Sequence, residues 1–94
     1  MTVTVRLIGA LKHAAGSDII SVNYRKGLSV RELMKEVTTE APELNRSLVN
    51  PQLEDQGLNA LILVNSKEIS ALSGLDTKLK DGDEIAVVPV VHGG

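Results

Sequence analysis

The sequence of 94 residues predicts an α+β fold in which one mixed sheet carries one main helix across one face. Three observations support this prediction. The chain has the length of one domain with a single hydrophobic core. Residues 28–37 carry the signals of one amphipathic helix. Several short alternating or apolar segments, separated by turn residues, have the pattern of strands.

The first two strands are predicted at residues 2–9 and 18–24. Residues 2–9, TVTVRLIG, alternate between polar and apolar side chains, which indicates a half-buried strand. Residues 18–24, DIISVNY, place Ile20 and Val22 on the same face of a second strand. Between them, ALKHAAG predicts about one turn of helix, which Gly16 ends in the left-handed conformation. We expect the two strands to pair antiparallel across this wide connection.

The segment LSVRELMKEV, residues 28–37, is the best-signalled element of the chain. Ser29 is the expected N-cap of a helix, and Glu32 three residues later completes a capping box. An apolar stripe follows at the spacing i, i+3, i+4 and i+7. The stripe consists of Val30, Leu33, Met34 and Val37. Pro42 prevents the helix from continuing, so the helix should end shortly before it.

The second half of the chain predicts three more strands. Residues 60–65, ALILVN, are apolar on both faces, which favours a central strand. The following KEIS predicts a brief edge strand, and Asp81-Gly82 predicts a turn. EIAVVPVV forms the last strand, where Pro89 has no N–H and pairing should fail on one side. With the last strand beside the first, this order of elements is the β-grasp, or ubiquitin-like, arrangement.

Composition argues against several classes of function. The formal net charge is −2, whereas a nucleic-acid-binding protein needs a basic surface to neutralise phosphates. No apolar run approaches the roughly 20 residues that span a bilayer, so we expect no membrane partner. The chain has no cysteine, which excludes thiolate ligands and permits a cytoplasmic location. His13 and His92 lack the spacing of zinc ligands, so no metal site is expected.

The sequence ends in LKDGDEIAVVPVVHGG. This stretch resembles the C-terminal signature of the MoaD/ThiS family of ubiquitin-like sulfur carriers. The family pattern is a DGDE turn, an apolar strand, Pro-Pro-Val, a small residue and Gly-Gly. The N-terminal strand, ALKHAAG and LSVRELMKEV also match the family, so the resemblance spans nearly the whole chain.

The resemblance implies a function for the C-terminus. In this family, an ATP-dependent adenylating enzyme of the ubiquitin-activating type activates the carboxylate of the last glycine, and sulfur transfer then gives a thiocarboxylate. Gly94 would be this point of covalent attachment. The chain itself would have no catalytic residue and no bound cofactor, because the partner consumes the ATP. The residues of the tail that partners would recognise are Pro89, Val90, Val91, His92 and Gly93.

The resemblance also suggests where the sulfur goes. The acceptor of MoaD is the large subunit of molybdopterin synthase, so the expected function is that of the small subunit in molybdenum cofactor biosynthesis. Another sulfur acceptor would fit the same chemistry. We expect residues 1–91 to form the β-grasp domain and residues 92–94 to form a flexible tail, because glycine adapts to a narrow channel without side-chain clashes.

Three departures from the family pattern leave alternatives open. Val90 stands in place of the second proline, and His92 in place of the small residue. Val87 and Val88 stand where the last strand of the family usually has bulky or aromatic residues. A His-Gly-Gly ending resembles the eukaryotic ubiquitin-related modifier, so one alternative is a protein modifier or a carrier for tRNA thiolation. Another is a β-grasp interaction module with an inert tail. We expect His92 to be a solvated tail residue rather than a catalyst.

A carrier must also dock on its partners. We predict an exposed apolar patch on the open face of the sheet, formed by Ile8, Val88 and alternate residues of the segment from Leu61 to Val64. An exposed apolar patch of this kind marks an interface. The alternative is that Ile8 only caps the edge of the core.

Overall fold

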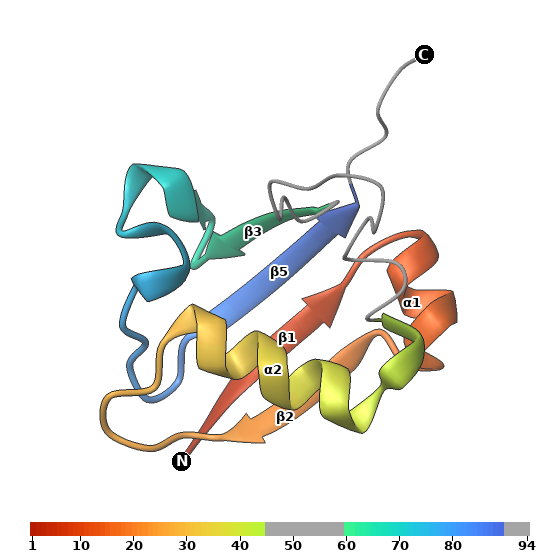
Figure 1. The fold of residues 1–94 in the computed structure, drawn as a ribbon, viewed down its shortest axis with the longest axis horizontal. Coiled ribbons are helices and arrows are strands. Elements are labelled where there is room, and N and C mark those ends of the chain that lie inside the picture. The colour runs from red at the N-terminus through yellow and green to blue at the C-terminus, as the bar shows by residue number, and fades with distance from the viewer. Residues whose placement is uncertain (45–59, 90–94) are drawn as a thin grey trace.

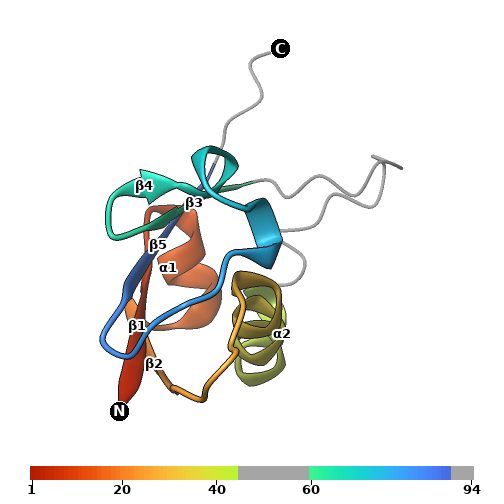
Figure 2. The ribbon, with the colours of Figure 1, turned by 90° about the vertical axis from the view of Figure 1, so that its left-hand side faces the viewer.

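The structure, a computed structural model, describes residues 1–44 and 60–89 (Figure 1). One sheet of five strands has the order β2-β1-β5-β3-β4. The strands are β1 (Thr2–Leu7), β2 (Ile19–Asn23), β3 (Ala60–Val64), β4 (Lys67–Glu68) and β5 (Glu84–Pro89). The helices are α1 (Ala10–Ala15) and α2 (Val30–Glu40), and the short 3₁₀ turns η1 (Ile69–Ala71) and η2 (Gly74–Asp76) follow β4. Helix α2 packs across one face of the sheet (Figure 2).

The strand directions confirm the predicted mixed sheet. β1 and β2 are antiparallel, as expected for the N-terminal pair. β5 lies between β1 and β3, parallel to β1 and antiparallel to β3. The last strand therefore enters the middle of the sheet beside the first, which is the predicted β-grasp arrangement (Figure 1).

Residues 60–64 form β3, which pairs with a strand on each side as expected of a central strand, although β3 is not the middle strand of the sheet. β5 occupies the centre, and β3 is the next strand outward, covered on its other side only by the two-residue β4. Ile62 and Val64 point into the core, whereas Leu61 on the opposite face is 47% exposed. The continuous apolar run in β3 therefore reflects one buried face and one face that is open to solvent.

Helix α2 begins and ends as its sequence signals indicate. The Ser29 hydroxyl accepts a hydrogen bond from the Glu32 N–H at 3.2 Å, and the Ser29 N–H donates to Glu32 Oε1 at 3.3 Å. This reciprocal pair is the predicted capping box. The helix ends at Glu40, two residues before Pro42. Its predicted apolar stripe is completely or almost completely buried against the sheet.

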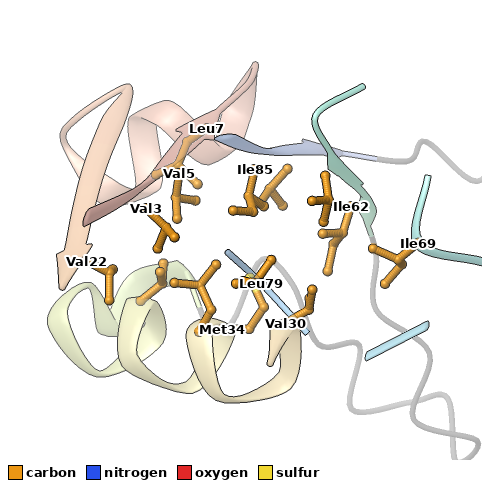
Figure 3. Packing of buried hydrophobic residues seen from close by; sticks show 14 of the residues in the cluster. Val3, Val5, Leu7, Val22, Val30, Met34, Ile62, Ile69, Leu79 and Ile85 are labelled. Carbon is orange, nitrogen blue, oxygen red and sulfur yellow. The ribbon is translucent and has the colours of Figure 1, made fainter. Parts of the chain in front are cut away.

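The core lies between α2 and the sheet (Figure 3). Alternate residues of β1, with Val3 and Val5 fully buried, face α2, and so do Ile85 and Val87 of β5. Burying one aliphatic side chain of this size contributes about 1.5–3 kcal/mol of transfer free energy. Because successive side chains of a strand point to opposite faces, the residues between these core residues lie on the other face of the sheet.

The first strand is shorter than the predicted 2–9. β1 ends at Leu7, and Gly9 then takes a φ of +62° at the beginning of α1. This left-handed conformation favours glycine and turns the chain out of the sheet. Gly16 ends α1 with a φ of +74°, and its N–H bonds the carbonyls of Lys12 and His13, which confirms the predicted helix end.

Candidate functional site

The predicted reactive end of the chain is carried by β5. Because β5 is the middle strand of the sheet, its C-terminal end at Pro89 emerges between β1 and β3. Pro89 is the only predicted tail residue that the structure places. The others, Val90, Val91, His92, Gly93 and Gly94, lie outside the described residues, and so does the predicted boundary between residues 1–91 and 92–94.

Pro89 ends the pairing between β5 and β1. The Ile8 N–H donates to the Val87 carbonyl at 3.1 Å, and the next bond of this parallel ladder would need an N–H at position 89. Proline has none, so the ladder stops here on the β1 side. On the β3 side, Pro89 still lies opposite Ala60. The chain is therefore released from β1 at the position that the sequence indicates.

The open face of the sheet is apolar close to this point. We define the open-face patch as the apolar side chains on the face opposite α2 near the end of β5. Its members are Ile8, Leu61, Leu63, Ala86 and Val88. Val88 lies opposite Leu61 in the β3–β5 register, and Ala86 lies opposite Leu63. The structure thus brings the predicted residues Ile8 and Val88 together on the open face. Of the residues of β3, Leu61 and Leu63 lie on this face with them, whereas Ile62 and Val64 face the core.

The patch is accessible. Ile8 is 42% exposed, and it is not among the residues that pack in the core cluster, so it does not cap the core edge. No helix of residues 1–44 and 60–89 covers this face of the sheet, as the edge-on view shows (Figure 2). Such a group of exposed apolar side chains on a small protein is typical of an interaction surface.

The same face becomes charged farther from Pro89. Arg6 of β1 and Glu84 at the start of β5 form an ion pair at 3.2 Å, and both side chains are about half exposed. Both side chains point to the open face, because their neighbours Val5 and Ile85 face the core and side chains alternate along a strand. The face therefore has an apolar end beside the chain exit and a charged end where β5 begins.

The DGDE turn is held by an asparagine that sequence reasoning missed. Asn65 Nδ2 donates to Asp83 Oδ1 at 2.9 Å, and Asn65 Oδ1 accepts from the Glu84 N–H at 3.0 Å. Asp83 Oδ2 in turn accepts from the Lys80 N–H at 2.7 Å. These bonds tie the end of β3 to the start of β5. The signal available in the sequence was the Asn-Ser pair after β3, since asparagine tolerates the positive φ of 49° found at Asn65.

The ionisable groups with shifted pKa values lie at helix caps and in a surface ion pair. Hydrogen bonds from the Ser29 N–H and hydroxyl lower the pKa of Glu32. Bonds from Ser70 likewise lower the pKa of Glu68 at the start of η1, and the bond to Glu36 raises the pKa of Arg25. None of these groups is part of the open-face patch. Within residues 1–44 and 60–89, no group of three or more His, Cys, Asp or Glu could hold a metal ion.

The sequence model of the ThiS family matches residues 5–94, which is all but the first four residues. The chain belongs to the ThiS family. It is therefore a member of a family of ubiquitin-like sulfur carriers, which are small non-catalytic proteins. The match includes the DGDE turn and the C-terminal Gly-Gly, two of the motifs that carry the resemblance to the family.

Solved structures agree with this membership of the ThiS family. Small archaeal modifier protein 1 from Methanosarcina acetivorans is 32% identical, with a TM-score of 0.79 over 99% of this chain and 96% of that one. A putative molybdopterin converting factor, subunit 1, from Pyrococcus furiosus is 26% identical, with a TM-score of 0.77 over 97% and 99%. CysO in the Amycolatopsis orientalis BexX/CysO complex is 27% identical, with a TM-score of 0.72 over 98% and 99%. Among curated proteins, none is similar enough to this ThiS-family chain to match it.

These comparisons establish the family and leave its branch open. The similar structures include a modifier protein, a molybdopterin converting factor subunit and a protein in complex with a partner, so the sulfur acceptor of this ThiS-family chain is a matter for proposal. In the part of the chain that the structure describes, no helix is long and apolar enough to cross a membrane.

Proposed function

We propose that this protein is the small, sulfur-carrying subunit of a molybdopterin synthase. The carboxylate of Gly94 is the group that carries the sulfur. An adenylating enzyme of the ubiquitin-activating type loads it, and the large subunit of molybdopterin synthase receives it. The observation that carries the proposal is the release of the chain from β1 at Pro89, directly beside the open-face patch.

The chemistry takes place on the terminal carbonyl carbon. A carboxylate oxygen of Gly94 attacks the α-phosphorus of ATP, an O–P bond forms and pyrophosphate leaves. Hydrosulfide then attacks the carbonyl carbon, a C–S bond forms, and the C–O bond to AMP breaks. The product is a thiocarboxylate. Activation is needed because the terminal carboxyl group, with an ordinary pKa of about 3.3–3.7, is ionised at neutral pH and is a poor electrophile.

The fold is consistent with a protein whose C-terminus is bound by other proteins. β5 pairs with β1 as far as Val87 and with β3 as far as Pro89, so paired backbone extends to within five residues of Gly94 in the sequence. Leu61 and Ile8 flank that point with exposed apolar surface, which a partner can cover while it binds the tail. The open-face patch therefore lies at the end of β5 from which the chain continues to Gly94.

A sulfur-transfer experiment tests the proposal. The thiocarboxylated protein is mixed with the large subunit of molybdopterin synthase and the pterin substrate of that enzyme, and intact mass is followed for both protein and pterin. We expect the pterin to gain sulfur while the carrier returns to the mass of its carboxylate. A variant that lacks Gly93 and Gly94 serves as the control and should support no transfer. If the loaded carrier keeps its sulfur under these conditions, the molybdopterin assignment is wrong.

A second candidate is a protein modifier. The 32% identity to a small archaeal modifier protein over almost the whole chain supports it. In that case Gly94 forms an isopeptide bond with lysine side chains. The measurement is a search of digested cell extracts for peptides in which a lysine ε-amine carries the C-terminal residues of this chain. Such peptides, together with no transfer to the pterin, would favour the modifier over the molybdopterin synthase subunit.

A further inference from the structure

The sheet has two edges, and they differ in length. β4, at one edge, has two residues and continues directly into η1, which leaves little backbone for pairing. β2, at the other edge, has five residues, Ile19–Asn23. Among the described residues, no strand or helix pairs with the outer side of β2. An unpaired edge of this kind is a template for pairing with another strand.

The hydrogen bonds to β1 determine which backbone groups of β2 point outward. The Leu7 N–H donates to the Asp18 carbonyl at 2.8 Å, and the Tyr24 N–H donates to the Met1 carbonyl at 3.0 Å. In an antiparallel pair, hydrogen-bonded residues alternate with residues whose groups face away. The even-numbered residues of β2 therefore bond β1, and Ile19, Ser21 and Asn23 present their N–H and C=O groups to the outer side.

One of these three positions is already occupied. The Ser17 hydroxyl donates to the Ile19 carbonyl at 2.8 Å and accepts from the Ile19 N–H at 3.4 Å. Both outward groups of Ile19 are thus satisfied within the chain. Ser21 and Asn23 have no such partner among residues 1–44 and 60–89. The open part of the edge consists of two N–H and two C=O groups, centred on Val22.

A groove of about 390 Å³ runs along this open part, between β2 and α2. Ser21, Val22 and Asn23 line it from the strand. Lys35, Glu36, Thr39 and Glu40 line it from the helix. The charge of Glu36 is compensated by Arg25, which it contacts at 2.9 Å. Lys35 and Glu40 form no ion pair with any described residue, so the groove has one free charge of each sign.

We propose that the β2 edge is the interface of a weak symmetric dimer with a second copy of this chain. In an antiparallel arrangement centred on Val22, Ser21 lies opposite the partner's Asn23, and Asn23 lies opposite the partner's Ser21. This register pairs every open N–H of one copy with an open C=O of the other and makes four hydrogen bonds. A register centred on Ser21 instead would require the groups of Ile19, which Ser17 already occupies.

The two free charges complement each other in this arrangement. β2 and α2 run in opposite directions (Figure 1), and Arg25, just after β2, contacts Glu32 and Glu36 in the first two turns of α2. Lys35 therefore lies toward the Asn23 end of the groove and Glu40 toward the Ser21 end. Because the two-fold axis exchanges these ends, Lys35 faces Glu40 of the partner subunit, and Glu40 faces the partner's Lys35. Each copy thus contributes its Lys35 to one of the two pairs and its Glu40 to the other.

The proposed dimer is independent of the carrier function. β2 is separated from β5 by β1, so pairing at this edge leaves the open-face patch uncovered. The interface is small, and interfaces of this size belong to the weak or transient class. The dimer should therefore be sought at high protein concentration rather than at the concentrations used for tight complexes.

Sedimentation equilibrium of the full chain up to about 1 mM protein tests the proposal, because weak association is detectable in that range. We expect reversible dimers in the native protein. Lys35→Glu and Glu40→Lys should each raise the dissociation constant about tenfold, because each creates like-charge contacts at both ends of the groove. The double variant restores opposite charges across the axis and should return the dissociation constant toward that of the native protein.

A backbone variant tests the register separately. Ser21→Pro removes one outward N–H in each copy and leaves the bonds to β1 in place, whereas Ser21→Ala keeps the N–H and is the matched control. We expect only the proline variant to dissociate. If that variant does not fold, the charge-exchange series alone decides. A native protein that is monomeric throughout the concentration range, or a dimer that all these variants leave unchanged, overturns the proposal.

Discussion

A Cβ atom placed on Gly9 would lie 3.3 Å from Cγ of Pro89. The start of α1 thus lies against the ring of the last described residue of β5. We predict that Gly9→Ala slows thiocarboxylate formation about tenfold, because a displaced Pro89 moves the base of the reactive tail. The measurement is the initial rate of loading by the adenylating enzyme, followed by intact mass.

Gly16→Ala is the matched control for this prediction. Gly16 also has a positive φ, 74°, but a Cβ there would meet no atom within 4 Å. Both variants place alanine at a positive φ at an end of α1, with the greater backbone strain at Gly9, whose ψ is −132° against 11° at Gly16, and only Gly9→Ala adds pressure on Pro89. Equal loading rates for the two variants, measured where both are folded, would show that the contact with Pro89 does not position the tail.

Leu61→Asp should weaken binding to the adenylating enzyme by about tenfold or more, because a carboxylate replaces an apolar side chain in the open-face patch. The fold should survive, since Leu61 is 47% exposed. Val88→Asp, nearer to the centre of the patch, should weaken binding as well. Leu72→Asp changes a side chain of similar exposure, 40%, outside the patch and should bind like the native protein. Binding is measured by titration calorimetry, and equal affinities for Leu61→Asp and Leu72→Asp would exclude the patch.

The Asn65 contacts predict a graded loss of stability. Asn65→Ala removes the bonds to Asp83 and to the Glu84 N–H and also places alanine at a positive φ. We expect a loss of about 2 kcal/mol in the free energy of unfolding. Asn65→Gly removes the same bonds without the backbone strain and should lose about half as much. Urea denaturation measures both, and an alanine variant as stable as the glycine variant would contradict the account of the backbone.

The capping box predicts a pH dependence. The pKa of Glu32 is lowered below its ordinary 4.5, chiefly by the bond from the Ser29 N–H. Ionised Glu32 therefore stabilises the fold above its unfolded pKa, and this contribution is lost as the pH falls through the lower, folded pKa. Glu32→Gln keeps an acceptor but cannot titrate, so the native protein should be the more stable of the two at about pH 7, and that advantage should be smaller at about pH 3.

Urea midpoints of the native and Glu32→Gln proteins at the two pH values measure this effect. In a Ser29→Ala background, which lacks the hydroxyl contact to Glu32, the pH-dependent difference should shrink. A difference that stays constant with pH would mean that the titration of Glu32 is not coupled to folding.

The strongest local signals predicted their elements well. The Ser29–Glu32 capping box, the left-handed Gly16 and the loss of pairing at Pro89 each depend on the chemistry of one or two residues, and all three are present in the structure. The position of β3 could not be predicted in the same way. An apolar run indicates that its side chains favour a strand and burial. Which strands lie beside it depends on how distant segments of the chain pair.

The candidate site was predicted only in part. The alternation of side chains along the first and last strands correctly predicted that Ile8 and Val88 lie on the open face. The choice of Leu61 and Leu63 needed the β3–β5 register, which no local pattern determines. The contact between Gly9 and Pro89 was likewise beyond prediction, since 80 positions separate the two residues along the chain.

The role of the terminal carboxylate can be measured directly. The native protein and a version amidated at Gly94 are each incubated with ATP, the adenylating enzyme and sulfide, and their intact masses are compared. We predict that the native protein gains the mass of one sulfur atom less that of one oxygen atom, while the amidated protein is unchanged. A native protein of unchanged mass beside an enzyme that loads another carrier, or an amidated protein that supports the same sulfur transfer, would contradict the account.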